Sequence, residues 1–264
     1  MRKLIRYLEQ YELYFKFKYA PPVYALLKKK NPRLQRNYNA ELRLYKTILH
    51  EIPTDGLIFD IGANIGSTVA IFEKIGRAII AVEPDLINLN CLRARYAKKP
   101  SITIVPMAVS DVVSEETIYL LDNGSALHTL SNKWKNFLES PENDRWKQPV
   151  TFSKRSSIQA TTLEALISKY GVPYFIKIDV EGYEEKVIKG LNTAIPIISF
   201  EANLPQFLKE TIICIEHLDQ LSEKTMFNYA TNEKLLLPEF VERDEMIKII
   251  SSTQLRYLDV YCKM

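Results

Sequence analysis

Apolar runs separated by a glycine-containing loop mark the region around which the chain is organised. Leu57-Ile58-Phe59 is typical of a short buried strand, and residues 67–75 have the pattern of a helix that ends at Gly76. The loop Asp60-Ile61-Gly62-Ala63-Asn64-Ile65-Gly66 lies between them. A strand, a tight loop and a helix in this order predict an α/β unit with a binding loop at the carboxyl end of the strand.

The glycines of this loop indicate a close approach of the backbone to a ligand. Gly62 and Gly66 have no side chain to block that approach, and the following helix begins with unpaired N–H groups. The spacing is D-x-G-x-x-x-G rather than G-x-G-x-x-G, so the pyrophosphate cradle of a dinucleotide site is missing. We therefore expect a nucleotide-like cofactor that has no pyrophosphate.

An acidic residue follows the next apolar run. Residues 78–82 predict a second strand, which ends at Glu83, twenty-one positions after Gly62. A βαβ unit places an acidic side chain beside a ribose at about this distance, and a carboxylate can accept hydrogen bonds from both ribose hydroxyls. The alternative is a solvated loop charge, but the preceding loop favours a ribose ligand.

The alternation of apolar runs and amphipathic segments continues to the end of the chain. Further strands are expected at 102–105, 174–178, 195–200, 227–230 and 257–262, and further helices at 86–97, 161–171, 182–189, 206–221 and 239–251. Thr161 and Glu164 have the spacing of a capping box. Seven strands that alternate with helices predict an α/β fold with a mostly parallel sheet and helices on both faces.

Two segments depart from this alternation. Residues 1–50 form a basic, aromatic extension with an expected helix at 39–50, which leaves 51–264 as the main domain. Within that domain, residues 112–160 are irregular, with expected strands at 117–121, 150–152 and 156–160 separated by polar residues. We expect this insertion to be antiparallel and to lie over the edge of the cofactor site.

Three motifs carry a resemblance to a known family. They are Asp60-Ile61-Gly62-Ala63-Asn64-Ile65-Gly66, Val82-Glu83-Pro84-Asp85 and Lys177-Ile178-Asp179-Val180-Glu181-Gly182-Tyr183-Glu184. In this order they resemble the FkbM-type branch of the class I S-adenosylmethionine (SAM)-dependent methyltransferases, over about residues 55–203, and the third motif is the specific one. The resemblance implies a Rossmann-like sheet with the strand order 3-2-1-4-5-7-6, its last strand antiparallel, and SAM as the cofactor.

The same resemblance implies a set of cofactor-binding residues at the carboxyl ends of the strands. Ser110 or Asp111, after the third strand, would accept a hydrogen bond from the adenine amine, although an ordinary turn is an open alternative. The full set is Asp60, Gly62, Asn64, Gly66, Glu83, Ser110, Asp111 and Asp179.

Methyl transfer to a hydroxyl benefits from a general base, and three residues are candidates. Asp179 ranks first because it ends a strand at the reactive edge, although it could instead pair with Lys177 or cap the next helix. Glu201 follows the fifth strand, and His128 lies in a loop of the insertion, where a histidine is often only a surface residue. Glu181 could instead bond backbone N–H groups at the helix start.

The cysteines, the apolar runs and the charges of the chain bear on metal binding and on its location in the cell. Cys91, Cys214 and Cys262 are scattered, which predicts neither a disulfide framework nor a zinc site, and no ligand spacing requires another metal. The chain contains no apolar run of membrane-spanning length and no signal peptide core. Residues 1–50 carry a charge of +9 and residues 51–264 carry −6. We expect a cytoplasmic protein whose basic front packs on the domain or touches the inner face of the membrane.

These observations favour an O-methyltransferase that acts on a hydroxyl of a sugar, a surface glycan or a secondary metabolite. A nicotinamide dehydrogenase would need the missing G-x-G-x-x-G. A nucleic-acid methyltransferase would need a base-reading tetrapeptide where Lys177-Ile178-Asp179-Val180 stands, so we expect no nucleic-acid partner. A non-catalytic, membrane-associated module that keeps the fold is a further alternative. The sequence leaves the oligomeric state and the identity of the acceptor open.

Overall fold

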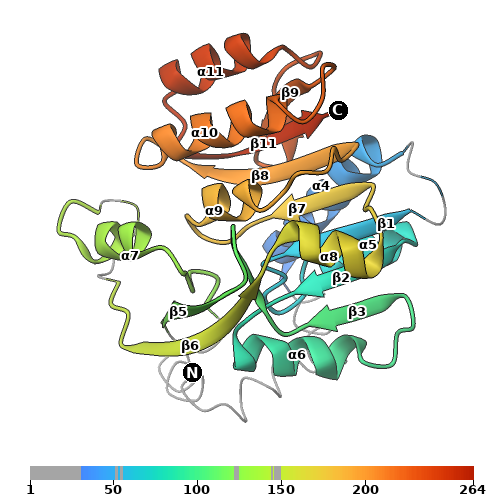
Figure 1. The fold of residues 1–264 in the computed structure, drawn as a ribbon, viewed down its shortest axis with the longest axis vertical. Coiled ribbons are helices and arrows are strands. Elements are labelled where there is room, and N and C mark those ends of the chain that lie inside the picture. Colours follow the sequence, from blue (N-terminus) through green and yellow to red (C-terminus); the bar gives the residue numbers. More distant parts are fainter. Residues whose placement is uncertain (1–30, 51–52, 54–55, 122–124, 144, 146–149) are drawn as a thin grey trace.

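The structure is a computed structural model that describes residues 31–264 apart from 51–52, 54–55, 122–124, 144 and 146–149. Within these residues the strands form an eight-stranded sheet and a separate three-stranded sheet (Figure 1). Helices cover both faces of the larger sheet. The α/β class predicted from the sequence is confirmed.

The larger sheet has the strand order β10-β9-β11-β8-β7-β1-β2-β3 in the described part of the chain. Strands β3, β2, β1, β7 and β8 run parallel to one another, whereas β11 is antiparallel to both β8 and β9. This arrangement confirms the expected order 3-2-1-4-5-7-6 and adds the short edge strand β10. The bounds are β1 Leu57–Ile61, β2 Ala78–Val82, β3 Ile102–Val105, β7 Phe175–Ile178, β8 Ile197–Asn203, β9 Met226–Thr231, β10 Lys234–Leu235 and β11 Tyr257–Lys263.

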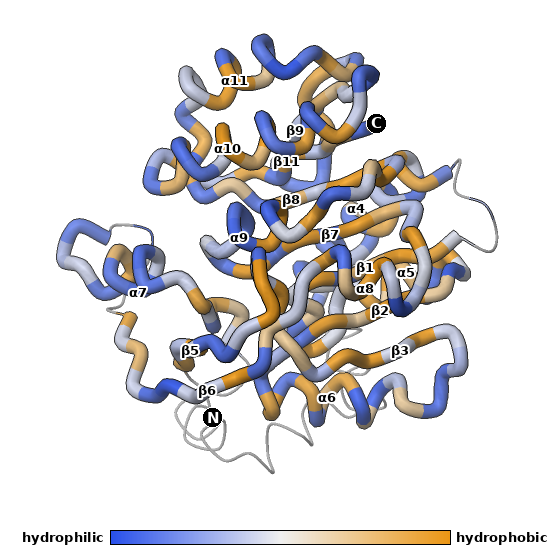
Figure 2. Tube along the Cα trace, viewed as in Figure 1, coloured by the Kyte–Doolittle hydropathy of each residue, from blue (hydrophilic) through white to orange (hydrophobic). Residues whose placement is uncertain are grey.

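Two hydrophobic cores lie on opposite faces of this sheet. The strands carry most of the apolar positions, while the outer helices alternate apolar and polar residues (Figure 2). One core contains residues of α8 Leu163–Tyr170, α9 Glu184–Lys189, α10 Leu208–Asp219 and α11 Arg243–Ser252. The other contains residues of α4 Pro32–Ile48, α5 Val69–Ile75 and α6 Leu86–Tyr96. Burial on both faces explains why the strands are continuous apolar runs.

The insertion forms the smaller sheet and one helix. Strand β5 Ser114–Leu120 pairs antiparallel with β6 Lys154–Thr161, and β4 Ala108–Val109 lies parallel to β6. The antiparallel character of the insertion was expected. The strand expected at 150–152 is wrong, because these residues have no strand pairing, and Val150 and Phe152 pack instead in a small aromatic cluster.

Helix α7 Asn132–Glu139 fills the part of the insertion that we expected to be an irregular polar stretch. Trp134, Phe137 and Leu138 have the helical spacing that marks one apolar face, and Trp134 and Leu138 are fully buried. The Ser131 side chain caps the helix by accepting a hydrogen bond from the Trp134 N–H. These two signals are visible in the sequence and identify the helix.

The cap of α8 differs from the expected capping box by one residue. Thr162, not Thr161, accepts a hydrogen bond from the Ala165 N–H. Glu164 does not reach back to its own helix start; its carboxylate accepts from Asn192 N and Thr193 N in the loop before β8. The glutamate therefore joins α8 to that loop.

Helix α4 begins earlier than the expected residue 39 and belongs to the core of the main domain. Tyr45 packs edge-on against Phe72, with ring centroids 4.9 Å apart, and also contacts Phe175. Most of the basic extension, residues 1–30, lies outside the described residues, so its contact with a membrane and the cytoplasmic location stay predictions. No helix in the described part is both long and apolar enough to cross a bilayer.

The docking of α4 can be tested by truncating one buried side chain. We expect Ile48→Ala to lower the free energy of unfolding by about 2–5 kcal/mol, the range for a buried Leu, Ile or Met truncated to Ala. Ile48 is 4% exposed, whereas Lys46 on the same helix is exposed. Lys46→Ala is the control in urea denaturation, and an equal effect of the two substitutions would contradict the packing of α4.

Candidate functional site

The loop after β1 is held against the main sheet at its carboxyl edge. Gly62 has φ +83°, its N–H donates to the Val82 carbonyl, and a Cβ at this position would lie 1.8 Å from the Asp179 carbonyl oxygen. Gly66 has φ +80°, and its Cβ would meet Leu92 and Tyr96 of α6. The close backbone contacts that require glycine at these two positions are therefore contacts within the protein. Contact of Gly66 with the cofactor stays a prediction.

Glu83 organises the adjacent loop from the end of β2. Its carboxylate accepts hydrogen bonds from Asn64 N and Asp85 N, each at 2.8 Å, and from the Asn88 amide at 3.4 Å. Burial raises the pKa of Glu83 to about 7, and the hydrogen bonds from the two backbone N–H groups act in the opposite direction. The side chain thus joins the two loops at which the sequence placed the cofactor.

A pocket with a cavity volume of about 90 Å³ opens beside this carboxylate. The main domain contributes Gly62, Asn64, Glu83 and Asp179 to its lining, and the insertion contributes His128. The insertion also closes over the loop, because the Asn64 amide donates to the Ser125 carbonyl at 3.1 Å. The structure thus brings together five residues predicted for the site.

Unsatisfied polar atoms near this pocket fit a polar ligand. Asn88 lines the pocket, and among the described residues its Oδ1 has no hydrogen-bond partner although the residue is 1% exposed. Both carboxylate oxygens of the fully buried Asp60 also lack hydrogen-bond partners in this part of the chain. Burial raises the pKa of Asp60 to about 6, against the opposing effect of the Lys177 charge. Buried polar groups without partners are costly, and a ligand's donors would satisfy them.

Three carboxylates converge next to this pocket. Asp179 follows β7, Glu181 lies two residues later, and Glu201 lies near the end of β8; each offers an oxygen within 4.8 Å of the others. Lys177 Nζ lies 2.9 Å from Asp179 Oδ2, so the ion pair named as an alternative for Asp179 is present. The pair does not remove Asp179 from the site, because Asp179 also lines the pocket.

The two glutamates of the cluster receive hydrogen bonds from neutral donors. The Trp134 indole N–H donates to Glu181 at 3.1 Å, and the Asn203 amide donates to Glu201 at 2.7 Å. Burial raises the pKa of both glutamates well above the usual range, and the charge of Asp179 raises both further. The cluster therefore combines one ion-paired carboxylate with two carboxyls that hold protons more tightly.

One sequence-based interpretation is wrong and another stays untested. The residue that bonds the backbone at the start of α9 is Glu184, which accepts from Val180 N and Gly182 N, rather than Glu181. Ser110 is fully buried behind the site, where its hydroxyl contacts Asp111 and Tyr183. Asp111 forms an ion pair with Lys186 at 2.8 Å. Binding of the adenine amine by Ser110 or Asp111 stays a prediction.

The cluster also has the composition of a cation site. Asp179, Glu181 and Glu201 could together hold a divalent ion through one oxygen each. The sequence assigned no metal ligands, because the three residues have no recognisable ligand spacing, and it left the need for a divalent metal open. The residues meet through the pairing of β7 with β8.

Comparison with protein families identifies the family of this chain. The profile of the Methyltransferase FkbM domain matches residues 60–249, which is most of the chain. The chain belongs to the FkbM family of methyltransferases. The resemblance predicted from its three motifs is therefore confirmed. Each of the motifs lies wholly within the matched residues.

Individual relatives of this FkbM-type methyltransferase are distant. The hexuronic acid methyltransferase AglP of Haloferax volcanii is 23% identical over 170 residues, which span 62% of this chain and 62% of that protein. Among solved structures, precorrin-6y C5,15-methyltransferase from Geobacter metallireducens is 13% identical, covers 86% of each chain and has a TM-score of 0.42. The plantazolicin methyltransferase BpumL, in complex with S-adenosylhomocysteine (SAH), is 11% identical, covers 99% of this chain and 98% of that one, and also has a TM-score of 0.42.

The fit of the loop against Asp179 can be tested with two glycines that share a backbone conformation. Gly76 has φ +84°, but a Cβ at this position would have no atom within 4 Å, so Gly76→Ala should cost only the left-handed strain, about 1–2 kcal/mol. Gly62→Ala adds the collision with the Asp179 carbonyl and should cost about 2–5 kcal/mol. We expect it also to weaken SAH binding at least tenfold, measured by calorimetry.

Unchanged SAH affinity in a folded Gly62→Ala variant would show that this loop does not shape the cofactor site. Gly76→Ala controls for strain alone and should bind SAH as the unaltered protein does.

Proposed function

We propose that this methyltransferase transfers a methyl group from SAM to a hydroxyl of a sugar, a surface glycan or a secondary metabolite. The convergence of Asp179, Glu181 and Glu201 at the edge of the cofactor pocket carries the proposal. The likeness to a hexuronic acid methyltransferase supports a sugar as the acceptor.

The residues around the pocket suit the parts of SAM. Glu83 would bind the ribose hydroxyls, because a carboxylate accepts from both. Val82, Pro84 and Met107 line an apolar slot that adjoins the pocket at Gly62 and would take the adenine. Asp60 and Asp179 would lie toward the positively charged end of the cofactor, where carboxylates are favoured.

The carboxyl groups of the site favour a hydroxyl over a carboxylate as the accepting group. A carboxylate acceptor would find no cation to pair with in the cluster, because Lys177 is already paired with Asp179. A hydroxyl donates a hydrogen bond to a carboxyl group and needs a base to take its proton. The site therefore suits formation of a methyl ether better than formation of a methyl ester.

Asp179 is the proposed base. Its carboxylate is paired with Lys177 and lines the cofactor pocket, whereas burial raises the pKa values of Glu181 and Glu201, which favours their protonated forms. SAM supplies an activated methyl group on its sulfonium. As the acceptor oxygen forms a bond to the methyl carbon and the carbon–sulfur bond breaks, the hydroxyl proton passes to the carboxylate of Asp179. Alignment of this kind can supply about 7–11 kcal/mol.

The proposed reaction can be tested by following a labelled methyl group. We would incubate the purified protein with SAM that carries a trideuterated methyl, together with methyl glycosides and glycan extracts, and locate the label by mass spectrometry after hydrolysis. A trideuteromethyl ether is the expected product. A label found only in methyl esters or in nitrogen-linked methyl groups would contradict the hydroxyl assignment.

The ribose role of Glu83 can be tested by removing its carboxylate. We expect Glu83→Ala to weaken SAM binding by about 1.5–3 kcal/mol, the range for a hydrogen bond to a charged group. Asp85→Ala is the control, because it damages the same loop by removing the cap of α6 but leaves Glu83 in place. Calorimetry with SAM measures both, and equal losses of affinity would contradict a specific ribose contact.

The role of Asp179 can be tested by exchanging its carboxylate for an amide. We expect Asp179→Asn to lower turnover at least about a hundredfold while SAM affinity stays nearly unchanged, since the loss concerns proton transfer. Asp219→Asn removes a remote carboxylate that pairs with Arg243, and it should leave turnover unchanged. Because the carboxylate cluster could hold a cation, the assay is run both with EDTA and with Mg²⁺.

Normal turnover of Asp179→Asn together with a hundredfold loss in Glu201→Gln would move the base to Glu201.

A further inference from the structure

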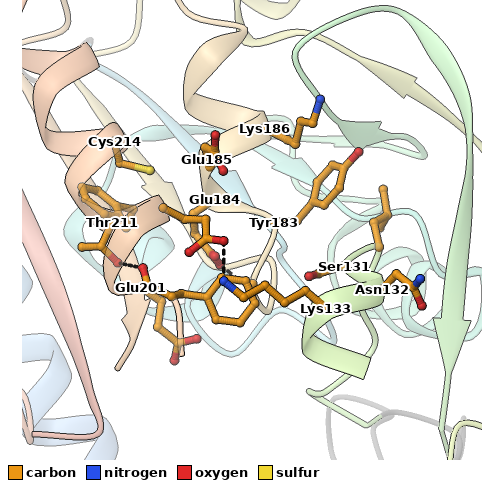
Figure 3. Close-up of a pocket in the computed structure, with 15 residues that line it drawn as sticks. Ser131, Asn132, Lys133, Tyr183, Glu184, Glu185, Lys186, Glu201, Thr211 and Cys214 are labelled. Atoms are coloured by element: carbon orange, nitrogen blue, oxygen red, sulfur yellow. Dashed lines mark hydrogen bonds and ion pairs between the residues drawn. The ribbon is translucent and has the colours of Figure 1, made fainter. Parts of the chain in front are cut away.

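A second pocket lies on the other side of the carboxylate cluster, between the insertion and the main domain. It has a cavity volume of about 360 Å³ and is bounded by the start of α7, the start of α9 and one side of α10 (Figure 3). The family match covers these elements but says nothing of what the pocket holds. The insertion forms one wall, so the sequence alone did not reveal it.

This pocket adjoins the cofactor pocket through the carboxylates. Glu201 lines the second pocket, while Asp179 and Glu181 line the cofactor pocket, and their oxygens lie within 4.8 Å of one another. Leu130 lines both pockets. A molecule bound in the second pocket can therefore place a hydroxyl at the cluster, next to the methyl donor.

The charges around the second pocket select against an anionic ligand. Four glutamates and two lysines are found among its described lining residues. Both lysines are already engaged, because Lys133 forms an ion pair with Glu210 and Lys186 forms one with Asp111 at 2.8 Å. A ligand carboxylate would have to displace one of these pairs to gain a cationic partner.

The rest of the lining suits a hydroxyl-rich ring. Glu201 and Glu185 offer acceptors for hydroxyl protons, while Leu130, Phe200 and Phe207 provide apolar surface for the carbon–hydrogen face of a ring. In Figure 3 the Lys133 side chain extends across the pocket from α7, with Tyr183 on one side of it and Glu201 on the other.

We propose that this second pocket binds the methyl acceptor, and that the acceptor group it takes is an uncharged, polyhydroxylated ring such as a neutral hexose rather than a uronate. The proposal rests on the proposed function and goes further by naming the place and the charge class of the acceptor. The proposed acceptor group is uncharged, whereas the name of the Haloferax volcanii relative refers to a hexuronic acid.

The charge class can be tested by binding matched sugars to the SAH-saturated protein. The neutral probes are the methyl α-glycosides of D-glucose, D-galactose and D-mannose. The anionic probes are the methyl α-glycosides of D-glucuronate and D-galacturonate, which match the first two. Ligand-observed NMR titration gives the affinities of all five. We expect at least one neutral glycoside to bind, and to bind at least tenfold tighter than its uronate. Equal or tighter binding of a uronate, or no binding of any neutral glycoside, would overturn the proposal.

The location can be tested with one substitution at two asparagines of the same helix. Asn132 and Asn136 are both exposed residues of α7, but Asn132 lines the second pocket and Asn136 does not. We expect Asn132→Trp to weaken binding of the neutral glycoside at least tenfold and Asn136→Trp to leave it unchanged, with SAH affinity unchanged in both. Equal glycoside binding by the two variants would place the acceptor elsewhere.

These outcomes separate the acceptor proposal from the proposed function. A labelled methyl ether formed on a uronate, or formed equally well by both asparagine variants, would refute the acceptor pocket and leave the O-methyltransferase assignment standing. A protein that binds SAH and the neutral glycoside but forms no methyl ether on any acceptor would refute the function while leaving the pocket assignment intact.

Discussion

The ammonium group of Lys177 is buried at the centre of the sheet, where it balances the acidic side chains on which the site depends. Lys177 is 9% exposed, and its pKa is raised because the charges of Asp179 and Asp60 outweigh the effect of burial. A buried charge is tolerated only when it is paired, and the same holds for the carboxylates around it. The charge of Lys177 opposes the rise in pKa that burial causes in Asp60 on β1 and Asp259 on β11, and it pairs with the partly exposed Asp179 just after β7.

The insertion extends this arrangement by holding the two glutamates. Trp134 donates to Glu181, while Arg145 donates to Asn203, whose amide in turn donates to Glu201. Arg145 also packs over the Trp134 ring at 5.1 Å. A segment outside the parallel sheet thus orients side chains at its carboxyl edge and forms one wall of the proposed acceptor pocket. Under the proposed function, the sheet would bind the cofactor while the insertion would shape the place for the acceptor.

The sequence predicted the parts of the fold that local pattern determines. Buried strands are continuous apolar runs, so β1, β2, β3 and β7 were found, and the motif residues Gly62 and Glu83 lie where the loop pattern placed them. Helix α7 was missed because the polar residues around it outweighed two visible signals, the Ser131 cap and the spacing of the apolar residues. Asp179 and Glu201 were each placed at the end of a strand, whereas Glu181, which joins them in the structure, was considered only as a ligand of backbone N–H groups. The second pocket depends on how α7 packs opposite α10, which no local pattern determines.

The central claim is that SAM and the acceptor meet at the carboxylates of Asp179, Glu181 and Glu201 from two separate pockets. A crystal structure of the protein with SAH tests it most directly. The account predicts the ribose on Glu83 and the sulfur atom directed toward Glu201 and the pocket beside α7. SAH bound with its sulfur directed away from these three carboxylates, or bound outside the pocket lined by Gly62 and Glu83, would contradict it.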